Sequence, residues 1–226
     1  IWIEIHAYSF LISFISYGTA ESVRSIMFPN FLMAILSRPP DCSIFNFKSP
    51  GLKTVLNEQQ LAITIKRLAH QVLENDLTLS DTVLIGLQPR GIFVSDQVVD
   101  EIKQMLPLEN IQYGKLDITF YRDDVRKELH LANHTDIPFS IENKNVILID
   151  DVLYTGRTIR AALDALLDFG RPAKVELCVL IDRRFSRQLP IQPDYVGKSI
   201  DSLISQRVKV FWKIRDGKQE VALLER

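Results

Sequence analysis

The apolar positions that follow residue 57 repeat with the period of a helix. Asn57, with Gln60 three residues later, matches an N-cap followed by its capping-box partner. The pattern therefore predicts an amphipathic helix with one apolar face. The apolar residues at helical spacing are Leu61, Ile65, Leu68 and Val72.

Further along the chain, short apolar runs predict buried strands that alternate with helices. This alternation is typical of βαβ units, whose strands form a mainly parallel central sheet with helices on its faces. We therefore expect an α/β fold. The expected strands are Val83–Leu87, Leu116–Tyr121, Val146–Ile149 and Val175–Ile181, with helices up to about Met105 and over Arg157–Phe169.

The pattern of residues changes towards the end of the chain. A loop rich in Pro and Arg follows Asp182, and two apolar stretches, Val208–Ile214 and Glu220–Leu224, flank a turn at Asp216-Gly217. Two strand-like stretches joined by a short turn predict an antiparallel hairpin. We expect this hairpin to follow the parallel sheet.

Residues 1–51 differ from the rest of the chain. The apolar stretch Ala7–Tyr17 is too short to cross a membrane, which takes about 20 residues. Proline-rich punctuation at Arg38-Pro39-Pro40 is typical of a linker. Because the chain begins with Ile1 rather than Met, we expect an atypical extension that is poorly ordered or reflects a misplaced start. The folded domain is expected over 52–226, with no membrane partner.

Composition narrows the class of protein. Charged residues make up 24% and apolar residues 46% of the 226 residues, with a formal net charge of -1. These values do not fit a disordered tail or a protein that coats nucleic acid, so any RNA contact needs a local basic patch. Cys42 and Cys178 are far apart, and Cys178 lies in an apolar run. A reducing cytoplasm therefore fits better than a disulfide framework.

The segment 146–158, V-I-L-I-D-D-V-L-Y-T-G-R-T, carries the candidate chemistry. An apolar strand delivers Asp150 and Asp151 to its carboxyl end, where ligands bind in open α/β sheets. A short loop then runs through Gly156 into a helix, so backbone N–H groups and a helix N-terminus converge as an anion cradle. The hydroxyls of Thr155 and Thr158 can donate further hydrogen bonds to phosphate oxygens.

The two acids require a ligand with more than a phosphate. Asp150 and Asp151 repel phosphate, but they can accept hydrogen bonds from ribose hydroxyls or hold Mg²⁺. A sugar phosphate satisfies both demands. The alternative interpretation is that the acids merely end a strand and Thr155-Gly156 merely opens a helix. The glycine-rich dinucleotide fingerprint and the Walker P-loop are absent from the sequence, which excludes those two phosphate-binding motifs.

The motif D-D-V-L-Y-T-G-R-T at Asp150–Thr158 resembles that of the PyrR family of pyrimidine operon attenuators and uracil phosphoribosyltransferases. The resemblance implies the type I phosphoribosyltransferase fold. Leu116–Asp124 looks like the family's flexible loop, and Leu180–Lys198 looks like its base-binding hood. The resemblance spans about Leu52–Arg226. It implies that phosphoribosyl pyrophosphate (PRPP) binds to Val146, Ile147, Leu148, Ile149, Asp150, Asp151, Val152, Leu153, Tyr154, Thr155, Gly156, Arg157 and Thr158.

The resemblance also implies where the other substrate groups bind. The pyrophosphate loop would be Gln88, Pro89, Arg90 and Gly91, although the family more commonly has Lys-Thr in place of Gln88-Pro89. The expected catalytic residues are Arg90, Asp150, Asp151 and Arg122 of the flexible loop. The expected base-binding residues are Asp182, Arg183, Tyr195 and Val196, where backbone groups of the hood would read the base.

Base preference is inferred by contrast with related purine enzymes of the same fold. An aspartate commonly stands there in place of Tyr154, and a lysine in place of Asp182. The resemblance therefore implies a uracil phosphoribosyltransferase that uses Mg²⁺ to convert uracil and PRPP to UMP and pyrophosphate. A purine phosphoribosyltransferase remains an alternative.

A second alternative is an RNA-binding attenuation regulator with little catalysis. The family's attenuators bind a pyrimidine operon leader mRNA and respond to uridine nucleotides such as UMP and UTP. Lys66, Arg67 and His70 lie where the family's RNA-facing helix would be, although three such residues are also common on a solvated helix face. The resemblance further implies a homo-oligomer, a dimer or higher.

Overall fold

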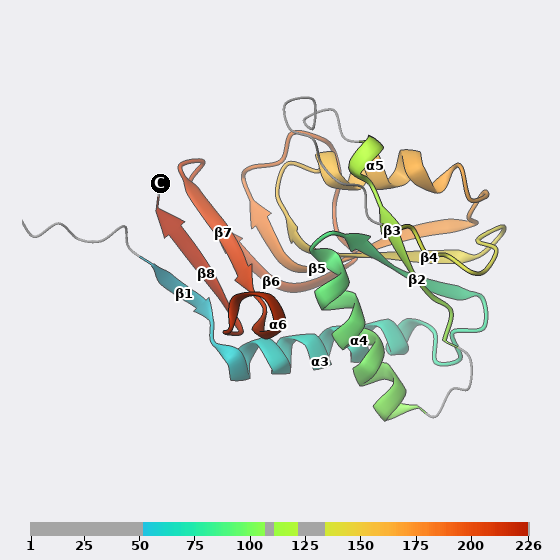
Figure 1. The fold of residues 1–226 in the computed structure, drawn as a ribbon, viewed down its shortest axis with the longest axis horizontal. Helices are drawn as coiled ribbons and strands as arrows, with labels where there is room; N and C mark the ends of the chain where they lie inside the picture. Colours follow the sequence, from blue (N-terminus) through green and yellow to red (C-terminus); the bar gives the residue numbers. More distant parts are fainter. Residues whose placement is uncertain (1–51, 107–110, 122–133, 226) are drawn as a thin grey trace, which may run out of the picture. The chain divides into compact units, whose positions relative to one another are not determined.

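The structure is a computed structural model that describes residues 52–106, 111–121 and 134–225 (Figure 1). The expected N-terminal extension, residues 1–51, lies outside the described residues. So do Arg122 and the last residues, 122–124, of the expected flexible loop. No helix within the described ranges has the length and apolar character needed to cross a membrane.

The central sheet has five parallel strands in the order β3-β2-β4-β5-β6. Helices α3 and α4 lie on one side of it and α5 on the other (Figure 1). The expectation of an α/β fold with a mainly parallel sheet is therefore confirmed. The strands are β2 (Thr82–Gln88), β3 (Tyr113–Asp117), β4 (Asn145–Leu153), β5 (Lys174–Arg184) and β6 (Tyr195–Asp201), and the helices are α3 (Glu58–Asn75), α4 (Gly91–Met105) and α5 (Arg157–Leu166).

Successive apolar residues along the strands pack alternately on the two faces of this sheet. In β4, Ile147 and Ile149 pack with α3 and α4, whereas Val146 and Leu148 pack with α5. Because neighbouring residues of a strand point to opposite faces, a continuous apolar run serves a sheet that is covered on both sides. The predicted capping box of α3 is present: Gln60 N donates to Asn57 Oδ1 at 2.8 Å, and Asn57 N donates to Gln60 Oε1 at 3.1 Å.

The expected C-terminal hairpin is confirmed, and it belongs to a second sheet. Strands β7 (Gln206–Phe211) and β8 (Glu220–Glu225) pair antiparallel, with the short helix α6 (Lys213–Asp216) between them. The N-terminal strand β1 (Lys53–Leu56), which the sequence did not predict, adds to β8.

Two other expectations require correction. The strand expected over 116–121 ends at Asp117, because the Asp117 carboxylate accepts hydrogen bonds from the backbone N–H and the hydroxyl of Thr119, at 2.9 and 2.6 Å. This local side-chain bonding competes with the strand, and a 3₁₀ turn, η1 (Thr119–Tyr121), follows. Strand β6 lies in the stretch that the sequence predicted as a loop.

Candidate functional site

The two adjacent acids, Asp150 and Asp151, lie inside strand β4, near its carboxyl end, rather than after it. Asp150 and Asp151 are each only 6% exposed, and Asp151 N donates to Asp150 Oδ1 at 2.8 Å. A buried carboxylate needs charged or hydrogen-bonding partners, because burial without them is costly. The carboxyl end of the central strand therefore presents two closely held acids to the same region of the molecule.

The loop after β4 forms the expected cradle. Gly156 has a φ of +92° and serves as the N-cap of α5 without a side chain to cap it. A Cβ atom there would lie 3.2 Å from Ile191 Cδ1 and 3.3 Å from Leu189 Cβ, so the residue has to be small. Arg157 N, the first N–H of α5, donates to Thr155 Oγ1 at 3.4 Å, while Gly156 has no side chain to cap the N–H groups that follow, which suits binding of an anion.

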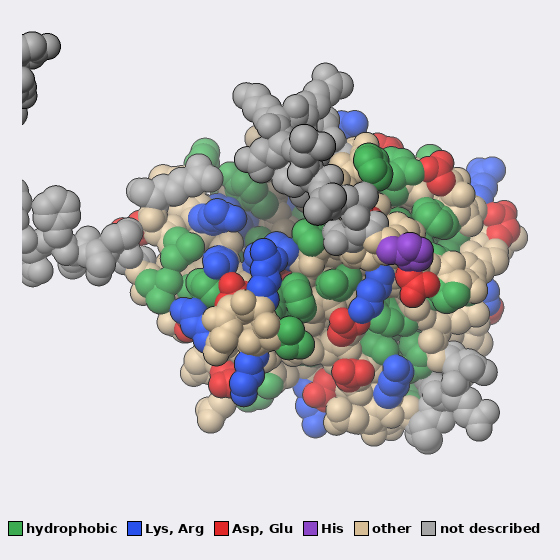
Figure 2. All heavy atoms as spheres, in the orientation of Figure 1, with side chains coloured by type: hydrophobic (Ala, Val, Ile, Leu, Met, Phe, Trp, Pro, Cys, Tyr) green, Lys and Arg blue, Asp and Glu red, His purple; other side chains and the backbone are tan. Residues whose placement is uncertain are grey.

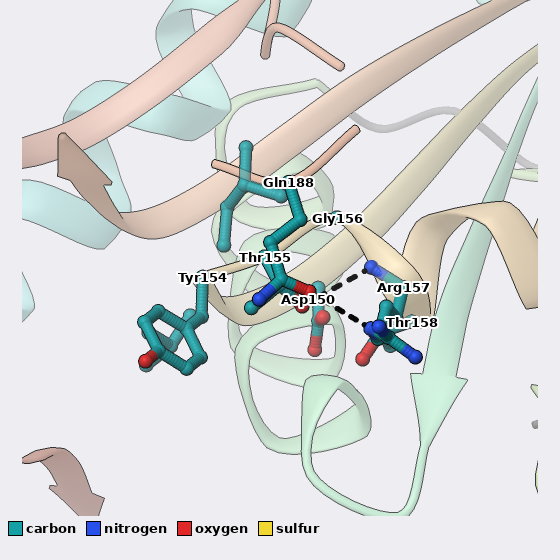
Figure 3. Close-up of a pocket in the computed structure, with 9 residues that line it drawn as sticks. Asp150, Tyr154, Thr155, Gly156, Arg157, Thr158 and Gln188 are labelled. Atoms are coloured by element: carbon teal, nitrogen blue, oxygen red, sulfur yellow. Dashed lines mark hydrogen bonds between the residues drawn. The ribbon is translucent and has the colours of Figure 1, made fainter. Parts of the chain in front are cut away.

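A cavity of about 400 Å³ lies over this loop (Figure 3). Asp150 forms one side of it, and the loop from Val152 to Thr158 forms most of the rest. Gln188, which comes from the segment between β5 and β6, closes another side, and its Oε1 accepts from Arg157 Nε at 3.0 Å. The structure thus brings the predicted phosphate loop and the acid Asp150 together around one cavity.

The expected pyrophosphate loop lies between β2 and α4. Arg90 Nε donates to Asp151 Oδ2 at 2.8 Å, and Arg90 Nη2 donates to the carbonyl of Val210 in β7 at 2.7 Å. A Cβ atom at Gly91 would lie 2.6 Å from the carbonyl oxygen of Ile149, so α4 begins in close contact with β4. Gln88 Nε2 donates to the carbonyl of His134 at 2.8 Å. Arg90 is therefore adjacent to the acids, and Pro89 supplies no backbone donor.

The expected base-binding residues Asp182 and Arg183 are the last buried residues of β5. The Arg183 guanidinium lies 4.0 Å from the centre of the Tyr154 ring and donates to Ser202 Oγ at 2.8 Å and the Gln206 carbonyl at 3.0 Å. Asp182 forms an ion pair with Arg187. Both residues therefore lie next to the phosphate loop, and their contact with a base stays a prediction.

The side chain of Tyr195, one of the expected base-binding residues, lies away from the phosphate loop. Tyr195 begins β6, at the amino end of the sheet, where its hydroxyl donates to Glu176 Oε2 at 2.8 Å and accepts from Asn75 Nδ2 at 2.8 Å. Its side chain lines a separate cavity of about 280 Å³. The sequence predicted a loop here, whereas Tyr195 is the first residue of a parallel strand, at the end of the sheet away from the phosphate loop. Recognition of the base by backbone groups near Tyr195 stays a prediction. Val196 is half-buried and packs against the core on the α5 side of the sheet.

The three candidate RNA-binding residues are exposed on α3. Arg67 has a structural use, since its guanidinium donates to the carbonyl of Val196 at 3.3 Å and to that of Gly197. β6 is the edge strand of the sheet, and Arg67 satisfies two of its carbonyls. Lys66 and His70 have no such contact among the described residues. On the face drawn in Figure 2, basic side chains alternate with acidic ones.

The donor set suits a magnesium ion that is bound together with a substrate. Asp150 and Asp151 offer carboxylate oxygens, the ligands that Mg²⁺ prefers. Within the described ranges, no cluster of three or more His, Cys, Asp or Glu side chains could hold a metal alone. Mg²⁺ is commonly bound by one or two carboxylates plus substrate oxygens, so the residues fit this mode.

Two residues that line or brace the cavity were not expected from the sequence. Arg187 and Gln188 lie in the hood, and each bonds to the phosphate loop: Arg187 Nη1 donates to the Tyr154 carbonyl at 2.7 Å. The only signal in the sequence was a second arginine after Arg183, and a surface arginine in a loop gives no indication of its partner.

Comparison with known proteins places this geometry in a family. A phosphoribosyl transferase domain model matches residues 51–213. The chain is 42% identical to the bifunctional protein PyrR of Enterococcus faecalis over 76% of this chain and 96% of that protein. It is also 42% identical to the bifunctional protein PyrR of a Picosynechococcus species, with the same coverage of both chains.

Solved structures agree on the fold. A hypoxanthine-guanine phosphoribosyltransferase from Bacillus anthracis superposes with a TM-score of 0.57 at 20% identity, over 77% of this chain and 99% of that chain. At this identity the likeness shows the fold alone, which confirms the expected type I phosphoribosyltransferase architecture. With the strong identity to the curated relatives, these findings confirm the resemblance seen in the sequence: the chain belongs to the phosphoribosyltransferase domain family and, within it, to the PyrR family.

Proposed function

We propose that this chain is a uracil phosphoribosyltransferase that converts uracil and PRPP to UMP and pyrophosphate, through a domain that spans residues 52–226. The observation that carries the proposal is the cavity lined by the buried acid Asp150 and by the loop that turns at Gly156 into α5, with the buried Asp151 next to Asp150 in β4. The relatives named bifunctional protein PyrR support the choice of a pyrimidine base. We further propose a reducing cytoplasm as the compartment, because Cys178 is a free, buried thiol.

Each part of the site has a separate task in this proposal. The loop N–H groups, with the hydroxyls of Thr155 and Thr158, hold the 5-phosphate, and Asp150 and Asp151 accept hydrogen bonds from the ribose hydroxyls. Positive charge develops on the ribose as the pyrophosphate leaves, so Arg90 stabilises the departing negative charge. Fixing these groups in one geometry lowers the entropic part of the barrier.

Binding of PRPP requires a rearrangement at Arg90. In the described structure its guanidinium is paired with Asp151 and with the Val210 carbonyl. A pyrophosphate would compete with Asp151 for this cation, and the released Asp151 would then be available to the ribose. Mg²⁺, when bound by Asp150 and Asp151, would neutralise charge on the pyrophosphate. The residues of β5, Asp182 and Arg183, with Val196 of β6, would border the base.

Release of pyrophosphate is the test of this function. Purified protein would be incubated with PRPP and Mg²⁺, with uracil, hypoxanthine, guanine or orotate as the acceptor. Uracil-selective release is the expected result. Turnover with hypoxanthine or guanine instead would make the chain a purine phosphoribosyltransferase, and PRPP binding without turnover on any base would contradict the enzymatic proposal.

The exposed Lys66 and His70 on α3 favour a second function, binding of a pyrimidine operon leader RNA under the control of UMP or UTP. Contacts with RNA phosphates release counterions, so affinity should fall steeply as salt increases. The measurement is leader-RNA binding at several salt concentrations, with and without UMP, against a scrambled RNA. Equal affinity for the leader RNA and the scrambled RNA would mean that these residues attract RNA only weakly, through charge, without specific recognition.

A further inference from the structure

The segment between β5 and β6 is bonded directly to the phosphate loop. Gln188 N and Leu189 N both donate to the Thr155 carbonyl, at 3.0 and 3.2 Å, and Arg157 Nε donates to Gln188 Oε1 at 3.0 Å. These bonds join the hood to the cradle through its backbone and through one side-chain amide. They fix the distance between the two segments but do not involve the side chain of Asp182, which lies near the end of β5.

Arg187 adds a side-chain connection between β5 and the phosphate loop, beside the stacking of Arg183 on Tyr154. Its Nη2 pairs with Oδ1 of Asp182 at the end of β5, and its Nη1 donates to the carbonyl of Tyr154 at 2.7 Å. A single planar guanidinium thus bridges the strand that borders the base and the loop that cradles the phosphate. Planar, forked donation of this kind is specific to arginine, since a lysine ammonium is a point charge on a flexible stem.

The bridge is sheltered, which makes its loss consequential. The Asp182 side chain is 12% exposed and that of Arg187 is 22% exposed. Removing one member of such a pair leaves a poorly solvated charge, and the remaining partner then moves or attracts water. Tyr154 is held from two directions, because its ring lies against Arg183 while its carbonyl is held by Arg187. Loss of Arg187 would release the Tyr154 carbonyl and leave only the ring contact.

We propose that Arg187 is a positioning residue that holds the base side and the phosphate side of the cavity in one geometry, so that neither substrate is bound well without it. The proposal rests on the proposed phosphoribosyltransferase function. It assigns to Arg187 no contact with either substrate. Its effect acts through Asp182 and Tyr154, whose placement decides where the ribose carbon and the base meet.

The same segment provides a matched control. Arg184 pairs with Asp201 through two hydrogen bonds, of 2.8 and 3.0 Å, so its ion pair is as well formed as that of Arg187. Both members are more than half exposed, at 54% and 55%, and neither is bonded to the phosphate loop in the described structure. Removing Arg184 therefore removes a hood arginine and an ion pair without removing the bridge.

The experiment compares the wild type with Arg187→Gln, Arg187→Lys and Arg184→Gln. The measurements are kcat, the KM for uracil, the KM for PRPP, the affinity for PRPP by calorimetry, and the melting temperature. For Arg187→Gln we expect both KM values to rise about tenfold, the effect of losing a charged hydrogen bond. The KM values of Arg187→Lys should fall between those of the wild type and Arg187→Gln, because a lysine keeps the ion pair with Asp182 but cannot also donate to the Tyr154 carbonyl. Arg184→Gln should stay within about twofold of the wild type.

The outcomes separate this proposal from the proposed function. If the wild type turns over uracil and Arg187→Gln has the same KM values as Arg184→Gln, the positioning role is wrong and the enzyme assignment stands. If the wild type binds PRPP but transfers its phosphoribosyl group to no base, the enzyme assignment fails. An unchanged PRPP affinity in Arg187→Gln would then also contradict the positioning role of Arg187. If Arg187→Gln melts well below the wild type, the KM values of Arg187→Lys test the proposal instead. Wild-type KM values in Arg187→Lys would contradict a role for the two-sided donation by the guanidinium.

Discussion

The two ends of the parallel sheet each carry a polar cavity, and their polar groups are used in opposite ways. At the amino end, Tyr195 bonds to Asn75 and Glu176, and Asp76 accepts from Thr82 Oγ1 at 2.8 Å, so these groups mainly satisfy one another. At the carboxyl end, α5 begins at a glycine that offers no capping side chain. Polarity and size alone therefore do not distinguish a ligand site from a structural cluster, whereas strand direction and uncapped backbone groups do.

Gly156→Val should have the largest effect at the carboxyl end. A β-branched side chain would be strained at a φ of +92° and would meet Leu189 and Ile191, closing the cradle. PRPP binding is expected to fall below detection by calorimetry. Gly217→Val is the control, because Gly217 also has a positive φ, +72°, but nothing lies within 4 Å of its added Cβ. Equal PRPP affinity in the two variants would mean that this loop does not bind the phosphate.

Asp151→Asn should weaken the same site less. The amide keeps the shape but loses the charge that pairs with Arg90 and, in our proposal, the acceptor for the ribose. We expect PRPP affinity to fall about 10- to 100-fold, the range for a charged hydrogen bond. Asp201→Asn, which removes an exposed partner of Arg184, should leave PRPP affinity unchanged. A wild-type affinity for PRPP in Asp151→Asn would remove this acid from the site.

The same contrast explains which features the sequence could predict. The run from Val146 to Thr158 is contiguous, so its strand, acids, turn and helix are fixed by local pattern, and the structure has them together. β1 and β6 were missed because their pairing is with strands distant in the chain, and β6 contains Gly197, Lys198 and Ser199, which carry little strand signal. The partners of Arg90 and Arg187 depend on the same tertiary packing, so no spacing in the sequence indicates them.

Tyr195→Phe tests the amino end, where we expect an effect on stability and none on catalysis. Burial raises the pKa of the Tyr195 hydroxyl to about 12, so it stays a neutral donor to Glu176 at ordinary pH. Its removal should lower the free energy of unfolding by about 1 kcal/mol, measured by urea denaturation. The KM for uracil should not change. A raised KM for uracil with unaltered stability would return Tyr195 to the base site.

Asp76, in the same cavity, should produce the smallest effect, and it should depend on pH. Burial alone would raise the pKa of its carboxyl, but hydrogen bonds from Thr82, Thr78 and the backbone N–H groups of Thr78 and Leu79 outweigh burial and hold it below its ordinary value of 3.8. A depressed carboxyl pKa stabilises the folded state above the unfolded pKa, and this stabilisation is lost as the pH falls through the folded pKa. Asp76→Asn should therefore melt below the wild type at about pH 6, with a difference that shrinks towards about pH 3. Asp81→Asn, at a side chain that is 77% exposed, should show no such convergence. A constant gap between Asp76→Asn and the wild type over this range would mean that the charge of Asp76 adds nothing to its hydrogen bonds, and the amino-end cluster would then be held by geometry alone.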